Sequence, residues 1–328
     1  MKVSANIFVI SLIFLTLFNI LVSLSIGPVH IPLNQIVSNI VLYSLHHDTN
    51  WTISTILFYI RLPRIVLAVI IGMILGVSGL ITQTIFKNPL GDPYLTGVSS
   101  GAAVGAAIGF LVSPFLVPVL AFIFAMVAVG ISFLISRSDG EVNTEMLILA
   151  GVSVSFLFSA VASYIIYLKI YNLRGVLFWL LGGLYGATWS DDFYLFATLL
   201  FIFPLIIYFR RELDIMLMGD EQAKSLGVDT GKVKTITLIS SSLVTSIAVS
   251  IVGIIGFIGL VSPHIGRKLV GESHRFLVFV SPLIGANILL VADTIARSTP
   301  QGEIPVGIVT AFIGSPVLIY LLYRRRKM

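Results

Sequence analysis

Runs of about twenty apolar residues recur along this chain, the length that a helix needs to cross the hydrocarbon core of a bilayer. These runs lie near 5–26, 65–86, 94–113, 115–135, 146–168, 192–209, 233–252, 274–296 and 304–323. A shorter apolar stretch, 256–270, contains Pro263. The pattern predicts an all-α polytopic membrane protein with nine spans, or ten if the shorter stretch also crosses.

The composition excludes a soluble protein. Apolar residues make up 57% of the chain and charged residues 11%, whereas a soluble domain carries about 25% charged residues. No polar stretch is long enough for a separate soluble domain, so residues 1–328 are expected to form a single transmembrane domain. The chain has no cysteine, which excludes disulfides and thiolate metal sites. The apolar run after Lys2 resembles a signal peptide, but with so many spans behind it we expect an uncleaved first helix.

The distribution of Lys and Arg favours ten spans with both termini in the cytoplasm. That topology places fifteen of the 20 basic residues inside, including the tail "YRRRKM", whereas nine spans would place the tail outside, against the positive-inside rule. The five basic residues left outside are Arg61, Arg64, Lys169, Arg174 and Arg297. The net charge of +5 fits this surplus in a multi-pass protein of the cytoplasmic (inner) membrane, and we expect no nucleic-acid partner.

Small residues recur at regular spacing within the predicted spans. The stretch "GVSSGAAVGAAIG" places Gly97, Gly101, Gly105 and Gly109 four residues apart. On a helix, this spacing forms a smooth ridge against which a neighbouring backbone packs closely. The segments that begin at Gly76 and Gly253 resemble each other weakly, and duplicated halves are common in transporters.

The longest hydrophilic stretch expected inside runs over about 210–234, and its middle predicts a short helix. Asp220 is expected to cap its N-terminus, with Glu221 in the first turn, Lys224 near the end and Gly227 as the stop. Ala223 and Leu226 are expected to form a small apolar face. A helix of two turns needs support from other elements. It is either a capped connector or a docking surface for a cytoplasmic partner.

Two other motifs in the chain resemble ligand sites but fail in detail. "GVDTGKV" has three residues between Gly227 and Gly231 and no Ser or Thr after its lysine, so it is not a phosphate-binding loop. His264 has no second metal ligand at a suitable spacing, and we expect it to pack or to hydrogen-bond. Pro263 is expected to break the helix near it.

Ionisable residues give no catalytic site. Asp293 and Arg297 lie four residues apart and are expected to form an i,i+4 ion pair at a membrane boundary. A proton relay, as in a self-sufficient secondary transporter, is the alternative, but it requires several acids at membrane depth. The chain contains no H-E-x-x-H and no G-x-S-x-G motif, so we do not expect an enzyme.

Four segments of the chain resemble one known family. These are "RLPRIVLAVIIGMILGVSGLITQTIFKNPLGDPYLTGVSSGAAVG", "MGDEQAKSLGV", "GFIGLVSPHIGRKLVGESHR" and "LLVADTIARSTPQGEIPVGIVTAFIGSPVLIYLL". In this order they resemble the permease subunits of ATP-binding-cassette (ABC) importers for iron–siderophores, haem and vitamin B12, the FecCD type. The resemblance spans about Arg61 to Leu322.

The resemblance implies a BtuC-like type II architecture of ten transmembrane helices, with spans 2–5 and 7–10 as inverted repeats. It implies a homodimer around the translocation path, two cytoplasmic ATPase subunits that hold ATP and magnesium, and an extracytoplasmic substrate-binding protein. This chain itself would hold no cofactor and no metal. The ATPase-coupling helix of the family falls on Asp220–Gly227, within a coupling loop of about 210–232.

By the same resemblance, Arg61, Arg64 and Arg297 would meet acidic groups of the binding protein. Pro63 would limit the start of its helix, so that both nearby guanidinium groups stay at the outer surface beside membrane lipid. Asn143 and Thr144 would lie at the cytoplasmic gate. The implied substrate is a metal chelate, with ferric siderophore first and cobalamin, haem or molybdate as alternatives.

Overall fold

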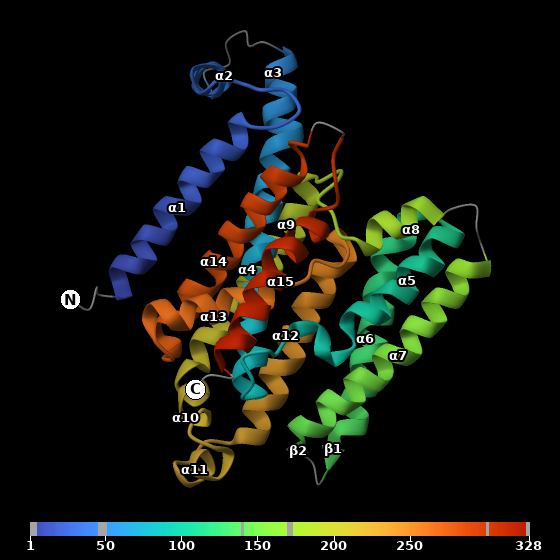
Figure 1. Ribbon diagram of the computed structural model, residues 1–328, viewed down its shortest axis with the longest axis vertical. Coiled ribbons are helices and arrows are strands. Elements are labelled where there is room, and N and C mark those ends of the chain that lie inside the picture. The colour runs from blue at the N-terminus through green and yellow to red at the C-terminus, as the bar shows by residue number, and fades with distance from the viewer. Residues whose placement is uncertain (1–4, 45–50, 139–140, 169–172, 300–301, 326–328) are drawn as a thin grey trace.

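The computed structural model describes residues 5–44, 51–138, 141–168, 173–299 and 302–325, which fold into a bundle of helices with one small hairpin (Figure 1). The first helices are α1 Ala5–Ser25, α2 Leu33–Ser44, α3 Trp51–Thr55, α4 Leu62–Ile85, α5 Val98–Val112, α6 Val117–Ser136, α7 Thr144–Leu168 and α8 Leu173–Leu180. The others are α9 Trp189–Tyr208, α10 Arg210–Met216, α11 Asp220–Ser225, α12 Thr230–Val252, α13 Ile258–Val270, α14 His274–Ala296 and α15 Val306–Arg325. Strands β1 Arg137–Ser138 and β2 Glu141–Val142 pair antiparallel before α7.

Every predicted span coincides with a helix, and the described residues contain seven helical segments long and apolar enough to cross a membrane. These are α1, Trp51–Ile85, Pro114–Ser136, α7, α9, α12 and α14. The segments Val98–Val112 and Val306–Tyr320 are shorter apolar helices, and α13 has 13 residues. The chain is therefore a multi-pass membrane protein, while the count of ten spans stays a prediction.

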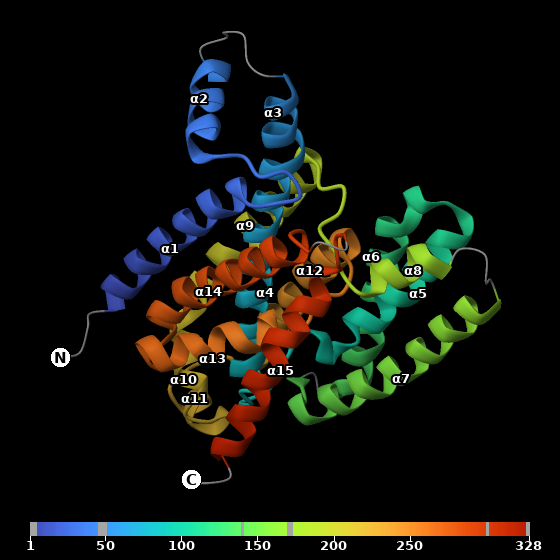
Figure 2. The ribbon, with the colours of Figure 1, turned by 45° about the horizontal axis from the view of Figure 1, so that its top comes forward.

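Helix α4 is the centre of the bundle. It packs against α14, α13, α9 and α12 and lies between them in both views (Figures 1 and 2). Gly72 and Gly76 allow this approach, because a Cβ atom on either would overlap the backbone of α14 at 285–286 or 281–282. One turn further on, Gly79 meets the backbone of Gly259 in α13. Small residues thus bring α4 into backbone contact with two helices from the far end of the sequence.

The ridge of small residues on α5 receives α6. A Cβ atom on Gly101, Gly105 or Gly109 would overlap the α6 backbone near Phe124, Leu120 or Val117, respectively. Gly97 differs from the other three, because it is the N-cap of α5 with a φ of +92°, in the left-handed region that favours glycine. Helices α5, α6 and α7 pack together on one side of the bundle, and α12 joins this group to α4.

The sequence predicts a helix start at Pro63 and a helix break near Pro263, and the structure places both boundaries elsewhere. The helix does not start at Pro63, since Trp51–Ile85 is continuous. A π-helical turn at Ile56–Arg61 precedes the proline, and such a wider turn accommodates a break in the regular bonding pattern. Pro263 lies inside α13, and the break occurs before it, where Gly253 and Phe257 both adopt positive φ values.

The bundle has two distinct ends. Helices α10 and α11 lie at one end, which we call the α11 end, near the β hairpin (Figure 1). Helices α2 and α3 project from the opposite end, which we call the α2 end (Figures 1 and 2). Groups of charged side chains that tie several helices together occur at both ends, and these two places are the candidate sites.

Candidate functional site

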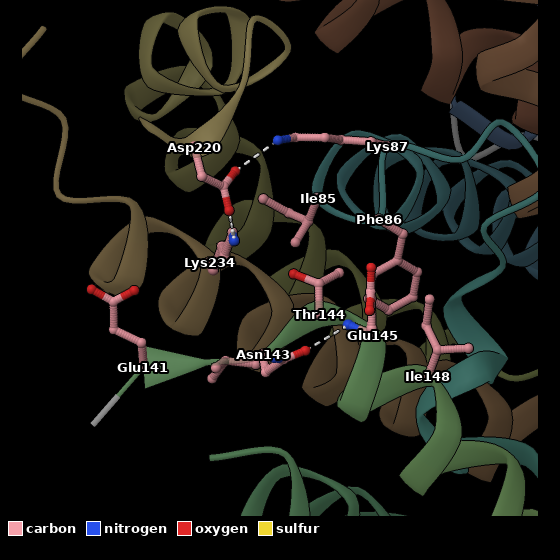
Figure 3. Close-up of a pocket in the computed structure, with 11 residues that line it drawn as sticks. Ile85, Phe86, Lys87, Glu141, Asn143, Thr144, Glu145, Ile148, Asp220 and Lys234 are labelled. Atoms are coloured by element: carbon pink, nitrogen blue, oxygen red, sulfur yellow. Dashed lines mark hydrogen bonds and ion pairs between the residues drawn. The ribbon is translucent and has the colours of Figure 1, made fainter. Parts of the chain in front are cut away.

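A pocket of about 600 Å³ opens at the α11 end, between the last turn of α4, the start of α7, α11 and α12 (Figure 3). Its lining is mostly polar or charged and includes Lys87, Glu141, Asn143, Thr144, Asp220 and Lys234. Ile85, Phe86 and Ile148 supply the apolar part of the wall. The pocket therefore joins the coupling loop that the sequence predicts to the gate candidates that it also predicts.

Asp220 ties three helices together at this pocket. Its Oδ1 accepts a hydrogen bond from Nζ of Lys87, just after α4, at 2.8 Å, and its Oδ2 accepts one from Nζ of Lys234 in α12. Both pairs are drawn in Figure 3. Burial by itself raises the pKa of Asp220, but the hydrogen bonds from Lys234 and Lys87 outweigh it and hold the pKa below its usual value. The carboxylate is therefore charged at neutral pH and links α11 to the helix at the centre of the bundle.

The structure has the predicted short helix at Asp220–Ser225, with two corrections. The N-cap is Gly219, with a φ of +128° and no side-chain cap, because the Asp220 carboxylate turns to the two lysines. Ala223 and Leu226 do not share a face: Ala223 is fully buried in the core, whereas Leu226 is 62% exposed. Gly227 ends the helix with a φ of +84°.

Further contacts fix the orientation of α11. Nζ of Lys224 donates to Oε1 and Oε2 of Glu141 in β2 at 2.8 and 2.9 Å, and this hydrogen bond raises the pKa of the lysine. Glu221 is exposed. Met218, which lies just before the helix, is 67% exposed. The helix is thus held by its charged side chains, while Leu226 and Met218 present apolar surface that the described residues leave exposed.

Asn143 and Thr144 occupy the first turn of α7 at the pocket (Figure 3). The Oδ1 atom of Asn143 accepts hydrogen bonds from the backbone N–H groups of Glu145 and Met146, both at 3.0 Å. This side chain therefore caps the helix. The hydroxyl of Thr144 is buried and has no partner among the described groups. The structure places both residues at the pocket, whereas their gating role stays a prediction.

Arg61 lies inside the α2 end of the bundle, contrary to the expectation that Pro63 keeps it at the surface. Its side chain is 3% exposed and donates to the carbonyl oxygens of Leu24, Ser25 and Val29. These carbonyls belong to the last turn of α1 and to the segment after it. The guanidinium group thus satisfies backbone acceptors that a helix end leaves unpaired.

Arg64 and Arg297 share one buried acid, Asp293. Its Oδ1 accepts from Nε and Nη2 of Arg64 at 2.9 and 2.6 Å, and its Oδ2 lies 3.5 Å from Nε of Arg297. The i,i+4 ion pair between Asp293 and Arg297 is therefore present. Arg64 also pairs with Glu303, and Arg297 donates to the hydroxyl of Ser23 in α1 at 2.5 Å. The cluster joins α1, α4, α14 and the segment before α15.

One buried polar chain escaped sequence reasoning. Nδ1 of His274 lies 2.6 Å from Oδ1 of Asp214, and its Nε2 lies 2.8 Å from Oγ1 of Thr84. These residues come from α14, α10 and α4, respectively. Nearby, Nε2 of Gln83 donates to the carbonyl of Leu260 at 2.9 Å, and its Oε1 accepts from Arg267. No local spacing could have predicted this, because the partners are 60 to 190 residues apart.

Neither candidate site resembles a metal centre. Among the described residues, no group of three or more His, Asp or Glu side chains is placed to hold a metal ion. The carboxylates at both ends are engaged by Lys or Arg, which neutralise them. What the two sites have in common is that ionic groups connect one end of the bundle to the central helix α4.

Comparison with known proteins gives a consistent result. The profile of the FecCD transport family matches residues 15–324. The chain is 41% identical over 277 residues to the cobalamin import system permease protein BtuC of Halobacterium salinarum, with 84% of this chain and 75% of that protein covered. It is 34% identical to the Fe(3+)-citrate import system permease protein YfmE of Bacillus subtilis, with 93% and 92% covered. A solved structure described as an inward-facing metal-chelate type ABC transporter aligns with a TM-score of 0.84 and 30% identity, over 98% of this chain and 99% of that one.

Proposed function

The chain belongs to the FecCD transport family of ABC transporter permeases, and from this premise we propose that it forms the translocation path of an importer for ferric siderophores. The chain would act as a homodimer with two ATPase subunits, which would bind ATP and magnesium, and with a substrate-binding protein. In this arrangement the α11 end faces the cytoplasm and the α2 end faces outward. Both termini then lie in the cytoplasm.

Helix α11 is the feature that carries the proposal. It is too short to be stable alone, yet it is fixed to α4 and α12 through Asp220 and to β2 through Lys224. Its apolar residue Leu226 is 62% exposed. A rigidly held helix with a free apolar side chain fits insertion into a cleft of the ATPase. Closure of the ATPases would then move α11 together with the α4 end that Lys87 anchors.

The test separates docking from folding. Leu226→Asp is expected to abolish co-purification of the ATPase subunit and transport, because it places a charge in an apolar contact. The variant should keep the thermal stability of the wild-type permease in detergent, since residue 226 contributes little to the core. Arg174→Gln, an exposed change on α8 outside the coupling loop, is the control. Wild-type ATPase association in Leu226→Asp would contradict the proposal.

We further propose that the α2 end receives the binding protein. Arg64 is the best-placed of the three arginines, since its side chain keeps 11% exposure next to Glu303, which keeps 30%. The double change Arg61→Glu with Arg64→Glu is expected to weaken association with the binding protein and to lower the salt dependence of binding. Equal affinity and an equal salt slope in the variant would refute this docking role. We also propose that Asn143 and Thr144 act at the cytoplasmic gate.

Cobalamin is the second candidate substrate, favoured by the 41% identity to a cobalamin import permease. Haem and molybdate remain alternatives within the same architecture. Proteoliposomes that contain the permease, its ATPase and its binding protein distinguish them. We expect ATP-dependent uptake of a radiolabelled ferric siderophore and none of labelled cobalamin. Uptake of cobalamin alone would show that cobalamin is the substrate, and the proposal that the chain is an importer permease would still hold.

A further inference from the structure

Helix α2 carries an apolar surface that the described residues leave uncovered. Leu33, Val37 and Ile40 follow one another at helical spacing and are 53%, 58% and 39% exposed. On the adjoining arc, Ile36 and Asn39 are buried against the rest of the chain at 1% and 6% exposure. The helix therefore buries one arc against described residues of the chain, while the arc of Leu33, Val37 and Ile40 is apolar and exposed.

The polar residues of α2 lie on the remaining arc. Asn34, Gln35 and Ser38 are exposed, and within the described part of the chain the side chains of Asn34 and Ser38 bond to groups of α2 itself. On a helix with 3.6 residues per turn, these positions are turned away from Leu33 and Ile40. The helix thus has one side suited to water and one side suited to hydrocarbon.

Charge argues against a soluble protein as the partner of this surface. The stretch 26–44 contains no Asp, Glu, Lys or Arg, so it offers no charged group to set the register of a docking protein. Exposed aromatic residues occur in α2 and in the helical segment that follows it: Tyr43, Trp51 and Tyr59 are exposed at 47%, 79% and 63%. Trp and Tyr are enriched where the hydrocarbon core meets the head groups.

The orientation of α2 also fits a membrane interface. Figure 1 looks down the axis of α2, so the helix runs across the long axis of the molecule, whereas Figure 2 shows it lengthwise. Helix α2 contacts the end of α1. Helix α1 is long and apolar enough to cross a membrane, and it exposes Phe14 and Phe18 at 68% and 61%. Helix α2 thus lies next to a helix that is long and apolar enough to cross a membrane and that also exposes apolar side chains.

We propose that α2 is an interfacial helix, embedded in the head-group layer of the membrane with Leu33, Val37 and Ile40 directed into the lipid. Helices of this kind lie in the plane of the interface with their apolar face at the boundary between head groups and acyl chains. Lipid bound there would hold the end of α1 and the Trp51–Arg61 extension of α4 at a fixed depth. The proposal depends neither on the substrate nor on which leaflet is involved.

Site-directed spin labelling tests this directly, because the native chain has no cysteine. The variants Val37→Cys and Ser38→Cys place a nitroxide on neighbouring residues about 100° apart around the helix, one on the apolar arc and one on the polar arc, and Leu33→Cys with Asn34→Cys repeats the comparison. The full-length protein is reconstituted into vesicles of phosphatidylethanolamine and phosphatidylglycerol. Accessibility to oxygen, which partitions into lipid, is then compared with accessibility to a water-soluble nickel chelate.

The expected result is a severalfold higher ratio of oxygen to nickel accessibility at residues 33 and 37 than at residues 34 and 38. Equal ratios at all four positions would overturn the proposal, because the helix would then lie in water. Protection of residues 33 and 37 from both reagents would overturn it in favour of a protein partner such as a second copy of the chain. If residues 33 and 37 became protected from the nickel chelate only after the binding protein was added, the proposal would also be overturned, because that protein and not lipid would then cover them.

Discussion

The imidazole of His274 and the carboxylate of Asp214 form a short contact at the α11 end, with Nδ1 and Oδ1 2.6 Å apart. The backbone N–H of His274 donates to the same oxygen at 2.7 Å, and the far ring nitrogen reaches Thr84 in α4. The contact connects α10, which leads directly into α11, with the central helix. It is a second link, besides Asp220, between the proposed coupling region and the membrane-spanning core.

Removal of the Asp214 carboxylate is expected to destabilise the permease. Asp214→Ala leaves a ring nitrogen of a fully buried histidine without its partner, which costs about 1–3 kcal/mol. Thermal or urea unfolding in detergent measures the loss. Glu145→Gln, an exposed change at the neighbouring pocket, is the control and should stay within about 0.5 kcal/mol of wild type.

The stabilisation from Asp214 should disappear in acid. Burial raises the pKa of this carboxyl, but the hydrogen bonds from His274 and Ser273 outweigh it, so the pKa in the folded state lies below the usual value. A depressed pKa stabilises the folded state fully above the unfolded-state pKa of about 4, and the contribution fades as the pH falls through the folded-state pKa. The difference between wild type and Asp214→Ala should thus shrink below pH 4. A constant difference down to pH 3 would contradict this account.

Neutralisation of Asp293 should be more damaging than the loss of a surface ion pair. Asp293→Asn leaves Arg64 and Arg297 without their fully buried counter-charge, and a broken buried pair costs about 3–5 kcal/mol. The comparison is Glu272→Gln, which removes a partner of Arg267 that is 69% exposed and should cost less than about 1 kcal/mol. Equal losses of unfolding free energy in the two variants would show that the buried cluster adds nothing beyond a surface pair.

Two glycines of the α5–α6 pair should respond oppositely to the same change. A Cβ atom on Gly105 would overlap the Leu120 carbonyl, whereas nothing lies within 4 Å of the Cβ position of Gly130. Gly105→Ala is expected to cost about 1–3 kcal/mol through forced displacement. Gly130→Ala is expected to gain up to about 1 kcal/mol through helix propensity. Denaturation midpoints of the two variants in one detergent check the prediction, and a stable Gly105→Ala would refute the close packing.

Arg61 should matter for stability even where no binding protein is present. Its guanidinium group is buried and donates to carbonyls in the last turn of α1 and just after it, so Arg61→Glu would leave those acceptors unpaired beside a buried negative charge. We expect a loss of about 2–4 kcal/mol in the isolated permease. Arg174→Glu, at an exposed position, is the control. Unfolding of Arg61→Glu at the wild-type midpoint would contradict this structural role.

Local sequence predicted the elements better than their relationships. Each apolar run coincides with a helix, and the short helix at Asp220 is where its flanking Gly and charged residues indicate, because length, apolarity and capping are local properties. The unusual features were missed for the same reason. The helix continues through Pro63 after a π-helical turn. Gly219 replaces Asp220 as the cap, because the Asp220 carboxylate pairs with Lys87 just after α4 and with Lys234 in α12.

The sequence by itself determined that this chain is a multi-pass helical membrane protein of one family, because bilayer thickness requires runs of apolar residues and the four motifs retain their order. Only the tertiary structure decided which side chains are buried and which are exposed. Ala223 in α11 and Leu226 at its C-cap are three residues apart, yet one lies in the core and the other is exposed. Arg61, Arg64 and Arg297 looked like three surface charges, and Asp293 together with the carbonyls after α1 draws them inside. Burial depends on which helices pack together, and the residues that bring α4 against α14 are about 210 positions apart in the chain.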